Sequence, residues 1–275
     1  MAEVVANGVR FHVVRLGDHA RSGHRGRPAV VMLHGMVMDN LSSFYYTLAN
    51  PVALVHDVVL YDQRGHGLSE RPADGYTIAD GVTDLACLLD ALGLDEPVVL
   101  VGNSFGGTIA LEFAIGHPDR TAGLVLIEAH FAVEGWGEHM AGSLALAAFG
   151  LDDDDVKTWL DQQGGRKLNR MARNAEALIH DTTMLDDLQS VQPLSLDALR
   201  SVTCPLLALY GEHTDLIDRA RDLQRLVPRA QLRVLPEHTH SVLMEDRHAL
   251  EAILMPWLAQ RRSELSGTQR AEVAT

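Results

Sequence analysis

The sequence predicts an α/β fold built on one mainly parallel, doubly wound sheet. Short apolar runs rich in Val, Leu and Ile recur along the chain, bounded by Gly, Pro or polar residues, as buried strands are. Helix-like stretches alternate with them, at residues 78–92 and 104–116. This alternation implies βαβ crossovers with helices on both faces of the sheet. The expected strands are residues 29–33, 58–61, 97–101, 124–127, 206–210 and 232–235, with an antiparallel edge strand at 9–16.

A third observation sets the domain organisation. Residues 130–195 contain no strand-like run but several helix-like pieces, including 153–162 and 167–179. We therefore expect a helical cap, residues 130–195, inserted after the sixth strand into a core formed by residues 1–129 and 196–262. The acidic run at 152–155 suits a helix start, where carboxylates complement the partial positive charge. The polar residues 263–275 are expected to form a disordered tail.

Composition narrows the class of protein. The 275 residues are 47% hydrophobic and 22% charged, as in an ordinary globular protein, which argues against disordered and disulfide-stapled classes. The formal charge of −14 disfavours a nucleic-acid partner. Cys87 and Cys204 lie in apolar runs and are expected to be reduced thiols. No secretory signal and no membrane-length apolar run is found, so the expected location is cytoplasmic.

The strongest chemical signal is residues 102–107, Gly-Asn-Ser-Phe-Gly-Gly, which follow a strand and open a helix. A serine on such a sharp turn needs small neighbours, which Gly102 and Gly106 supply, while Gly107 permits close helix packing. The turn would project the Ser104 hydroxyl from the carboxyl end of the sheet.

A serine nucleophile needs a base, and the base needs an acid to orient it. The strand at 206–210 runs into Asp215, and the strand at 232–235 runs into His240. The order Ser104, Asp215, His240 is the order expected for this architecture.

Several stretches resemble the α/β-hydrolase-fold family in order and spacing. Leu-His-Gly at residues 33–35 is similar to its oxyanion loop, and Asp-Gln-Arg-Gly-His-Gly-Leu-Ser at 62–69 is similar to the loop after its fourth strand. His-Pro-Asp-Arg at 117–120 is similar to the turn before its sixth strand. His240 with Glu245 resembles its final histidine loop. Within these loops His34, His66 and His117 are expected to make loop hydrogen bonds, and Asp62 and Arg64 to brace their loop.

The resemblance implies roles for named residues. Ser104 would be the nucleophile, His240 the general base and acid, and Asp215 the acid that orients His240. The backbone N–H groups of Met36 and Phe105 would form the oxyanion hole.

Two alternatives to these roles stay open. Glu128 ends the strand at 124–127, where some members of the family keep their acid. His238 competes for the base, although the five-residue spacing to Glu245 favours His240, and Thr239 replaces a usual glycine.

The resemblance implies a serine hydrolase that cleaves a carboxylic ester or thioester, such as an esterase or thioesterase. Dehalogenases and epoxide hydrolases of this fold have Asp in place of Ser104, which disfavours those reactions; a cofactor-free dioxygenase is excluded only weakly. A carbon–carbon bond hydrolase acting on a ring-cleavage dienone is the main alternative, suggested by Asn103. Its carboxylate-binding arginine would be Arg166, Arg170 or Arg173. From another class, a non-catalytic ligand receptor of the same fold stays open.

The expected pocket lies between the carboxyl edge of the sheet and the cap. An apolar lining would suit a small-molecule substrate with a hydrophobic acyl part. No cofactor and no metal is implied, no membrane span is expected, and a homodimer stays open. The candidate pocket residues are Val37, Met38, Asn103, Phe131, Trp136 and Met140.

Overall fold

The computed structural model of the protein describes residues 2–17, 28–152 and 165–272. One eight-stranded sheet runs through it in the order β1-β2-β4-β3-β5-β6-β7-β8. The strands from β4 to β8 pair in parallel, whereas β2 pairs antiparallel with both β1 and β4. The strands are β1 (Ala2–Ala6), β2 (Val9–Leu16), β3 (Val30–Leu33), β4 (Val58–Tyr61), β5 (Val98–Asn103), β6 (Thr121–Ile127), β7 (Leu206–Gly211) and β8 (Ala230–Leu235).

Every strand expected from the sequence is present, but β2 is not the expected edge strand, because the additional strand β1 pairs outside it. Asn7 and Gly8 both have positive φ, 48° and 73°. A two-residue hairpin of this hand requires positive φ at both central positions, which explains the Asn-Gly pair. The hairpin places β1 at the antiparallel edge of the sheet.

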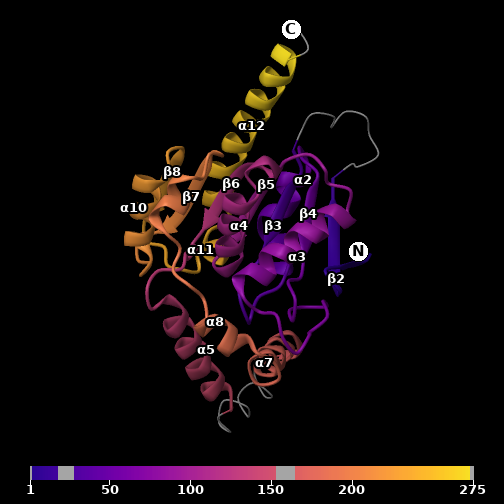
Figure 1. The fold of residues 1–275 in the computed structure, drawn as a ribbon, viewed down its shortest axis with the longest axis vertical. Coiled ribbons are helices and arrows are strands. Elements are labelled where there is room, and N and C mark those ends of the chain that lie inside the picture. The colour runs from indigo at the N-terminus through magenta and orange to yellow at the C-terminus, as the bar shows by residue number, and fades with distance from the viewer. Residues whose placement is uncertain (1, 18–27, 153–164, 273–275) are drawn as a thin grey trace.

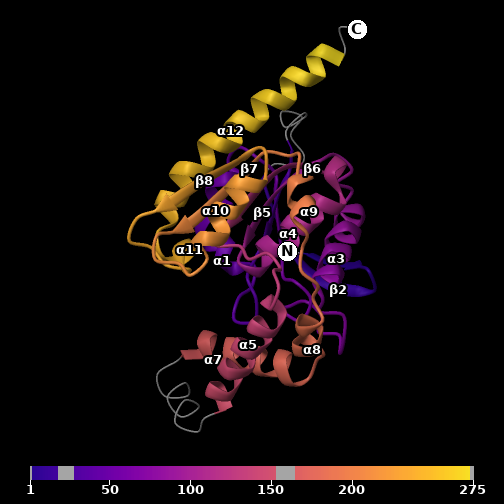
Figure 2. The same ribbon diagram turned by 60° about the vertical axis from the view of Figure 1, so that its left-hand side comes forward.

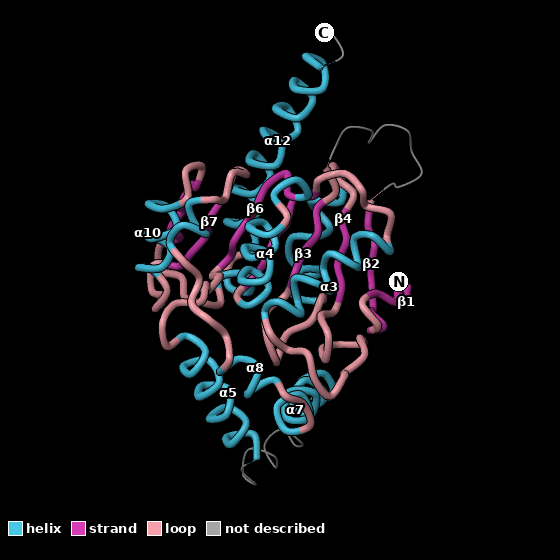
Figure 3. Tube along the Cα trace, in the orientation of Figure 1, coloured by secondary structure: helices cyan, strands magenta, loops and turns pink. Residues whose placement is uncertain are grey.

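Helices cover both faces of the sheet (Figures 1 and 3). Alternation along β4 illustrates the two layers, because Val59 packs in the cluster with α3, α4 and α10 while Leu60 packs with residues 42–53 and α12. The prediction of a mainly parallel, doubly wound sheet is therefore confirmed. The helices of the core are α1 (Ser42–Phe44), the π-helical η1 (Tyr45–Ala49), α2 (Asn50–Ala53), α3 (Ile78–Ala91), α4 (Phe105–Gly116), the 3-10 helix η2 (Pro118–Arg120), α10 (Ile217–Leu226), α11 (Val242–Glu245) and α12 (Arg247–Glu272).

Only helices are described between β6 and β7, as the sequence predicts for the cap. They are α5 (Trp136–Asp152), α7 (Gly165–His180), α8 (Met184–Gln189) and α9 (Leu196–Arg200). Figure 2 shows α5, α7 and α8 grouped beyond the carboxyl ends of the parallel strands, while α9 lies against the core. The expected helix at 167–179 lies within α7, and the one expected at 153–162 lies outside the described residues.

Helix α12 differs from the expected tail. It continues through residues 263–272, which were expected to be disordered, and extends away from the body of the molecule (Figure 1). This stretch lacks proline and contains the helix-favouring residues Glu, Leu, Gln, Arg and Ala beside Ser, Gly and Thr, so it is compatible with a continued helix. Within the described ranges, no helix combines the length and apolar character needed to cross a bilayer. Cys87 and Cys204 are both free.

Candidate active site

Ser104 occupies the sharp turn between β5 and α4. Its backbone has φ 49° and ψ −120°, a conformation that costs energy for any residue with a side chain. Glycines make the turn possible: a Cβ at Gly102 would overlap Gly107, and one at Gly106 would overlap the carbonyl oxygen of Leu33. The turn therefore holds Ser104 at the carboxyl edge of the sheet, before the N-terminus of α4.

Three side chains form a hydrogen-bonded chain at this edge. His240 Nε2 lies 3.2 Å from Ser104 Oγ, and His240 Nδ1 lies 3.2 Å from Glu128 Oε2. His240 comes from the loop between β8 and α11, and Glu128 follows β6. The imidazole side chain is 43% exposed, whereas the carboxylate is completely buried. The arrangement can pass a proton from the serine hydroxyl to a histidine whose other nitrogen faces a carboxylate.

Glu128 is fixed from several sides. Its Oε1 accepts a hydrogen bond from the backbone N–H of Gly211 at 2.5 Å, and its Oε2 accepts one from Thr214 Oγ1 at 2.6 Å. Glu128 also has φ 50°, an uncommon backbone conformation for a residue other than glycine. Buried carboxylates need such partners, and donors to the charged form favour it. The sequence carries no signal for the part played by Thr214.

The sequence favours Asp215 as the acid that orients His240, but the structure places Glu128, and not Asp215, beside His240. In the described structure Asp215 is exposed and makes no hydrogen bond to His240. Its charge acts instead on His130, whose ring centroid is 5.7 Å from that of His240. Burial and neighbouring His240 lower the pKa of His130 to about 4, although Asp215 opposes this. The physical reason for the difference is that β6 and β7 are neighbours, so the acid can follow either strand.

His238 and Glu245 serve the loop that carries His240. His238 Nδ1 lies 2.5 Å from the carbonyl oxygen of Pro236, and its Nε2 lies 3.6 Å from Asp246. The carboxylate of Glu245 accepts hydrogen bonds from the N–H and the hydroxyl of Thr239, which lowers the pKa of Glu245. The structure thus brings His240, and not His238, to Ser104.

Two backbone N–H groups close to Ser104 have no hydrogen-bond acceptor in the described protein. The N–H groups of Met36 and Phe105 make no hydrogen bond within the described protein, while those around Met36 do. Gly35 N–H donates to Asp39 at 2.7 Å, and Val37 N–H donates to His66 Nε2 at 2.8 Å. A Cβ built on Gly35 would lie 3.6 Å from the Cβ of Ser104, so the loop after β3 (residues 34–39, the β3 loop) abuts the serine. These two amides are able to donate to an oxygen bound there.

The candidate pocket residues have different surroundings. Phe131 and Trp136 are buried in the main hydrophobic cluster, and Val37 and Met140 pack against it. Met38 is exposed. The Asn103 Oδ1 atom is buried without a hydrogen-bond partner. Phe131 and Trp136, at the start of the cap, therefore contribute to packing the cap against the core.

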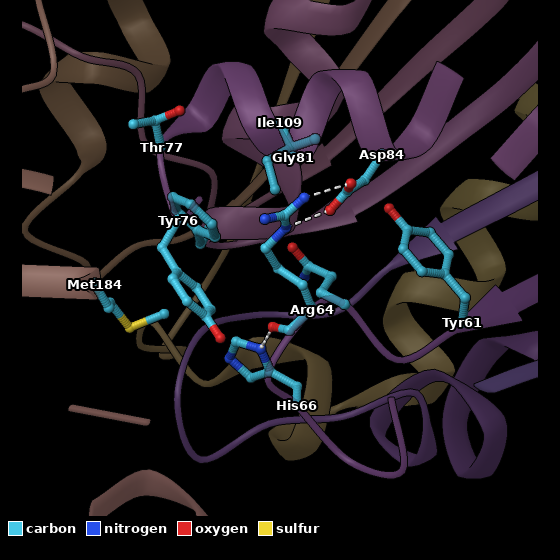
Figure 4. Close-up of a pocket in the computed structure, with 11 residues that line it drawn as sticks. Tyr61, Arg64, His66, Tyr76, Thr77, Gly81, Asp84, Ile109 and Met184 are labelled. Carbon is cyan, nitrogen blue, oxygen red and sulfur yellow. Dashed lines mark hydrogen bonds and ion pairs between the residues drawn. The ribbon is translucent and has the colours of Figure 1, made fainter. Parts of the chain in front are cut away.

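The described structure contains a small cavity beside Phe105 and a larger one lined mainly by other elements. The one in Figure 4, about 20 Å³, is lined by residues that include His66, Phe105 and the Arg64–Asp84 ion pair, and has room for about one water molecule. The other, about 450 Å³, is lined by residues of β2, of the segment 40–46, of the loop after β4 and of helix α7, which contributes Arg170. None of the six candidate pocket residues lines this larger cavity. Its volume is within the range of small-molecule sites.

One group of side chains in the described chain could bring three metal-ligating atoms within 4.8 Å of one another. It consists of Glu212, His213 and Glu237, all exposed. His213 Nε2 lies 3.5 Å from a carboxylate oxygen of Glu237, and Glu212 accepts a hydrogen bond from the N–H of Glu237. These contacts explain the cluster as a surface network.

The sheet, the inserted cap and the serine on the turn after β5 define an α/β enzyme of the hydrolase class. The chain matches the family pattern of the alpha/beta hydrolase fold over residues 28–247. It therefore belongs to the α/β-hydrolase-fold family, as the resemblance from sequence implies.

Several of the similar proteins are hydrolases, although a putative 2-succinyl-6-hydroxy-2,4-cyclohexadiene-1-carboxylate synthase of Bacillus subtilis also matches, 25% identical over 92% of this chain and 96% of that protein. The lipase LipV of Mycobacterium tuberculosis is 37% identical over 115 residues, 42% of this chain and 42% of the lipase. A 2-hydroxymuconate semialdehyde hydrolase of Pseudomonas putida is 51% identical over 71 residues, 26% of this chain and 25% of that enzyme. The chain spans less than half the length of either of these two hydrolases. The solved structure of Est816, described as an N-acyl homoserine lactone degrading enzyme, has a TM-score of 0.71 and 25% identity, covering 93% of this chain and 99% of Est816.

Proposed function

We propose that this protein is a serine hydrolase that cleaves a carboxylic ester or thioester of a hydrophobic small molecule. The observation that carries the proposal is the series of hydrogen bonds from Ser104 through His240 to Glu128. The backbone N–H groups of Met36 and Phe105, which have no acceptor in the described protein, lie beside it. A serine hydroxyl becomes a nucleophile when a base removes its proton, and a carboxylate stabilises the imidazolium that forms.

The reaction proceeds in two steps. Ser104 Oγ attacks the carbonyl carbon while its proton passes to His240 Nε2, and the carbonyl oxygen becomes an oxyanion that accepts bonds from Met36 and Phe105. The carbon–oxygen or carbon–sulfur bond then breaks as His240 returns the proton to the leaving group, and Ser104 keeps the acyl group. A water molecule gives its proton to His240 and attacks the acyl carbon, which releases the acid and restores Ser104.

Glu128 is the acid in this proposal, in place of Asp215. Its carboxylate touches His240 Nδ1, so it selects the tautomer with the proton on Nδ1 and the lone pair on Nε2, facing Ser104. Asp215 lies in solvent and contributes charge near His130.

A carbon–carbon bond hydrolase is the second candidate. It is supported by the 51% identical match to a 2-hydroxymuconate semialdehyde hydrolase, although that match covers only 26% of this chain. Arg166 lies outside the residues whose side chains are described; of Arg170 and Arg173, Arg170 lines the larger cavity, where a carboxylate could be held. We rank ester and thioester cleavage first, because the serine, histidine and free amides suffice for it.

A fluorophosphonate probe and an activated ester test the serine assignment. We expect the wild-type protein to label and to show a burst of product release, and Ser104→Ala to do neither. Ser201→Ala is the matched control, because this exposed hydroxyl donates only to the carbonyl oxygen of Ala198. If wild type neither labels nor turns over, the hydrolase proposal fails and a ligand receptor becomes the better explanation.

Parallel assays of short and long acyl esters, acyl thioesters and a ring-fission dienone separate the two candidate reactions. We expect the highest kcat/KM for an ester or thioester. A clear preference for the dienone would reverse the ranking.

A further inference from the structure

Two buried histidines join the β3 loop to the loop after β4 (residues 62–69, the β4 loop). His34 Nε2 accepts a hydrogen bond from the backbone N–H of Gln63 at 3.0 Å, and His66 Nε2 accepts one from that of Val37 at 2.8 Å. Each loop thus contributes one imidazole that accepts from the backbone of the other. The ring centroids are 5.1 Å apart, and both side chains are buried.

We propose that His66 is a positioning residue for the oxyanion site: its bond to Val37 N–H holds the preceding peptide so that Met36 N–H stays open toward Ser104. This inference rests on the proposed function, since it assigns a task to His66 only if Met36 binds an oxyanion. Both ring nitrogens of His66 bond to the backbone, to Val37 N–H and to the carbonyl oxygen of Arg64, and neither bonds to Ser104, so its action passes through the backbone.

The contacts of His66 fix a single tautomer. Its Nδ1 lies 2.8 Å from the carbonyl oxygen of Arg64, which can only accept, so Nδ1 carries the proton. Nε2 then has a free lone pair, as the bond from Val37 N–H requires. Burial beside His34 lowers the pKa of His66 to about 3, which keeps the imidazole neutral in ordinary buffers. A protonated imidazole would have two N–H donors and would lose this bond.

The backbone conformation of Val37 is strained and needs stabilisation from a neighbouring group. Its φ is 65°, in the left-handed region that β-branched residues avoid. A bond to its N–H fixes the orientation of the peptide plane between Met36 and Val37. Without that bond we expect the residue to relax toward negative φ, which would turn the plane and move the neighbouring amide of Met36.

The β4 loop is a firm support for His66. Arg64 donates two hydrogen bonds of 2.6 Å to Asp84 on α3, as Figure 4 shows, and both side chains are largely buried. The carboxylate of Asp62 accepts from Leu68 N–H in the same loop and from Leu41 N–H beyond the β3 loop, each at 2.8 Å. His66 is therefore held by a rigid loop and can act on the β3 loop.

A pair of isosteric variants tests the proposal. In His66→Gln the side-chain oxygen can take the place of Nε2 and accept from Val37, whereas in His66→Asn the amide nitrogen takes the place of Nδ1 and no acceptor reaches Val37. We expect His66→Asn to lower kcat about 30-fold with little change in KM, a part of what a lost oxyanion donor costs, and His66→Gln to restore most of it. Inhibition by an alkyl boronic acid, whose tetrahedral adduct occupies the oxyanion site, should weaken in parallel.

Other outcomes would overturn the proposal. Equal losses in the two variants, or a loss in His66→Asn without weaker boronate binding, would give His66 only a structural role. If His66→Asn does not fold, replacing Val37 by its α-hydroxy acid removes the same donor without touching His66 and should reproduce the loss of kcat; unchanged kcat would again refute the proposal. Failure of the proposed function is separate, because wild-type protein itself would then not label with fluorophosphonate.

Discussion

Glu128 combines an uncommon backbone conformation with a completely buried carboxylate. Its positive φ turns the chain just after β6, and three groups then approach the carboxylate: Gly211 N–H, the Thr214 hydroxyl and His240 Nδ1. Strain of this kind persists where the surroundings compensate for it, and often at functional sites. Because all three groups need an acceptor, the site requires a carboxylate at position 128.

We predict that Glu128→Gln abolishes most activity while Asp215→Asn does not. The oxygen of the new amide side chain must face Gly211 N–H, so the amide NH₂ faces Nδ1 of His240. An NH₂ donor there requires Nδ1 to be the acceptor, which moves the imidazole proton to Nε2. That tautomer cannot accept the proton of Ser104. Loss of the correct tautomer in a comparable site costs on the order of 10³–10⁴ in kcat. Steady-state kinetics with an activated ester measures both variants.

The melting temperature of each variant serves as the control, because Glu128→Gln also alters a buried network. A large loss of kcat in Asp215→Asn, with Glu128→Gln nearly active, would return the role of the acid to Asp215.

At the residue scale the sequence identifies side chains whose place is fixed by a motif. Ser104 follows from the glycines that its turn requires. The spacing to Glu245 selects His240, and Glu245 braces Thr239, the residue directly before His240. The acid is different, because Glu128 and Asp215 end adjacent parallel strands. Which of them reaches His240 depends on side-chain length and local φ, and a strand pattern encodes neither.

Helix α4 approaches the end of β3 more closely than any side chain would permit. A Cβ on Gly106 would overlap the carbonyl oxygens of Leu33 and His34, and one on Gly107 would overlap the side chain of Ala129. The glycines thus bring the helix N-terminus, with the Phe105 amide, against the β3 loop. The close packing of α4 on the end of β3 therefore also sets where the Phe105 N–H lies relative to the β3 loop.

We predict opposite effects of alanine at the two ends of α4. Gly106→Ala forces α4 and the β3 loop apart, and overpacking of this kind costs about 1–3 kcal/mol of unfolding free energy. Gly116→Ala, exposed and with nothing within 4 Å of its Cβ, should instead gain up to about 1 kcal/mol, because alanine favours helix. Urea unfolding measures both changes.

Labelling by fluorophosphonate supplies the second readout for this pair, with a fall expected only in Gly106→Ala. Equal stability of the two variants would show that the close approach at Gly106 is not what fixes α4.

At the scale of helices and strands, the pattern of apolar residues in the sequence predicts the elements that pack in the core. The buried strands appear as apolar runs because both faces of a parallel sheet are covered. Apolar runs do not predict the β1 hairpin, since an exposed edge strand has no such run. The lack of an apolar face predicts a tail at residues 263–272, whereas α12 continues through them without such a face.

For the whole molecule, the net charge of −14 says little about the site, which uses one buried carboxylate. Buried titratable groups matter more for stability. Burial lowers the pKa of His66 to about 3 and that of His130 to about 4, from an ordinary 6.5, and raises that of Glu112 to about 7 from 4.5. Unfolding returns all three groups to their ordinary values.

These shifts have opposite signs in their effect on stability. Between about pH 4.5 and 6.5 the unfolded chain protonates both histidines while the folded protein does not, so stability falls as pH falls. In the same window the folded protein keeps Glu112 protonated while the unfolded chain does not, so this group favours folding at the lower pH. The three groups together leave a net uptake of about one proton on unfolding.

We predict that the dependence of stability on pH changes in opposite directions when these groups are replaced. One proton corresponds to a slope of about 1.4 kcal/mol per pH unit in the unfolding free energy. Removing the opposing group in Glu112→Gln should steepen the fall toward low pH by up to that amount, and His66→Gln should flatten it by as much. Urea unfolding at intervals from pH 5 to 6.5 measures the slopes, with wild type as reference. A slope unchanged in Glu112→Gln would mean that this carboxyl is ionised in the folded protein, and a slope unchanged in His66→Gln would mean that His66 is not held neutral between the two loops.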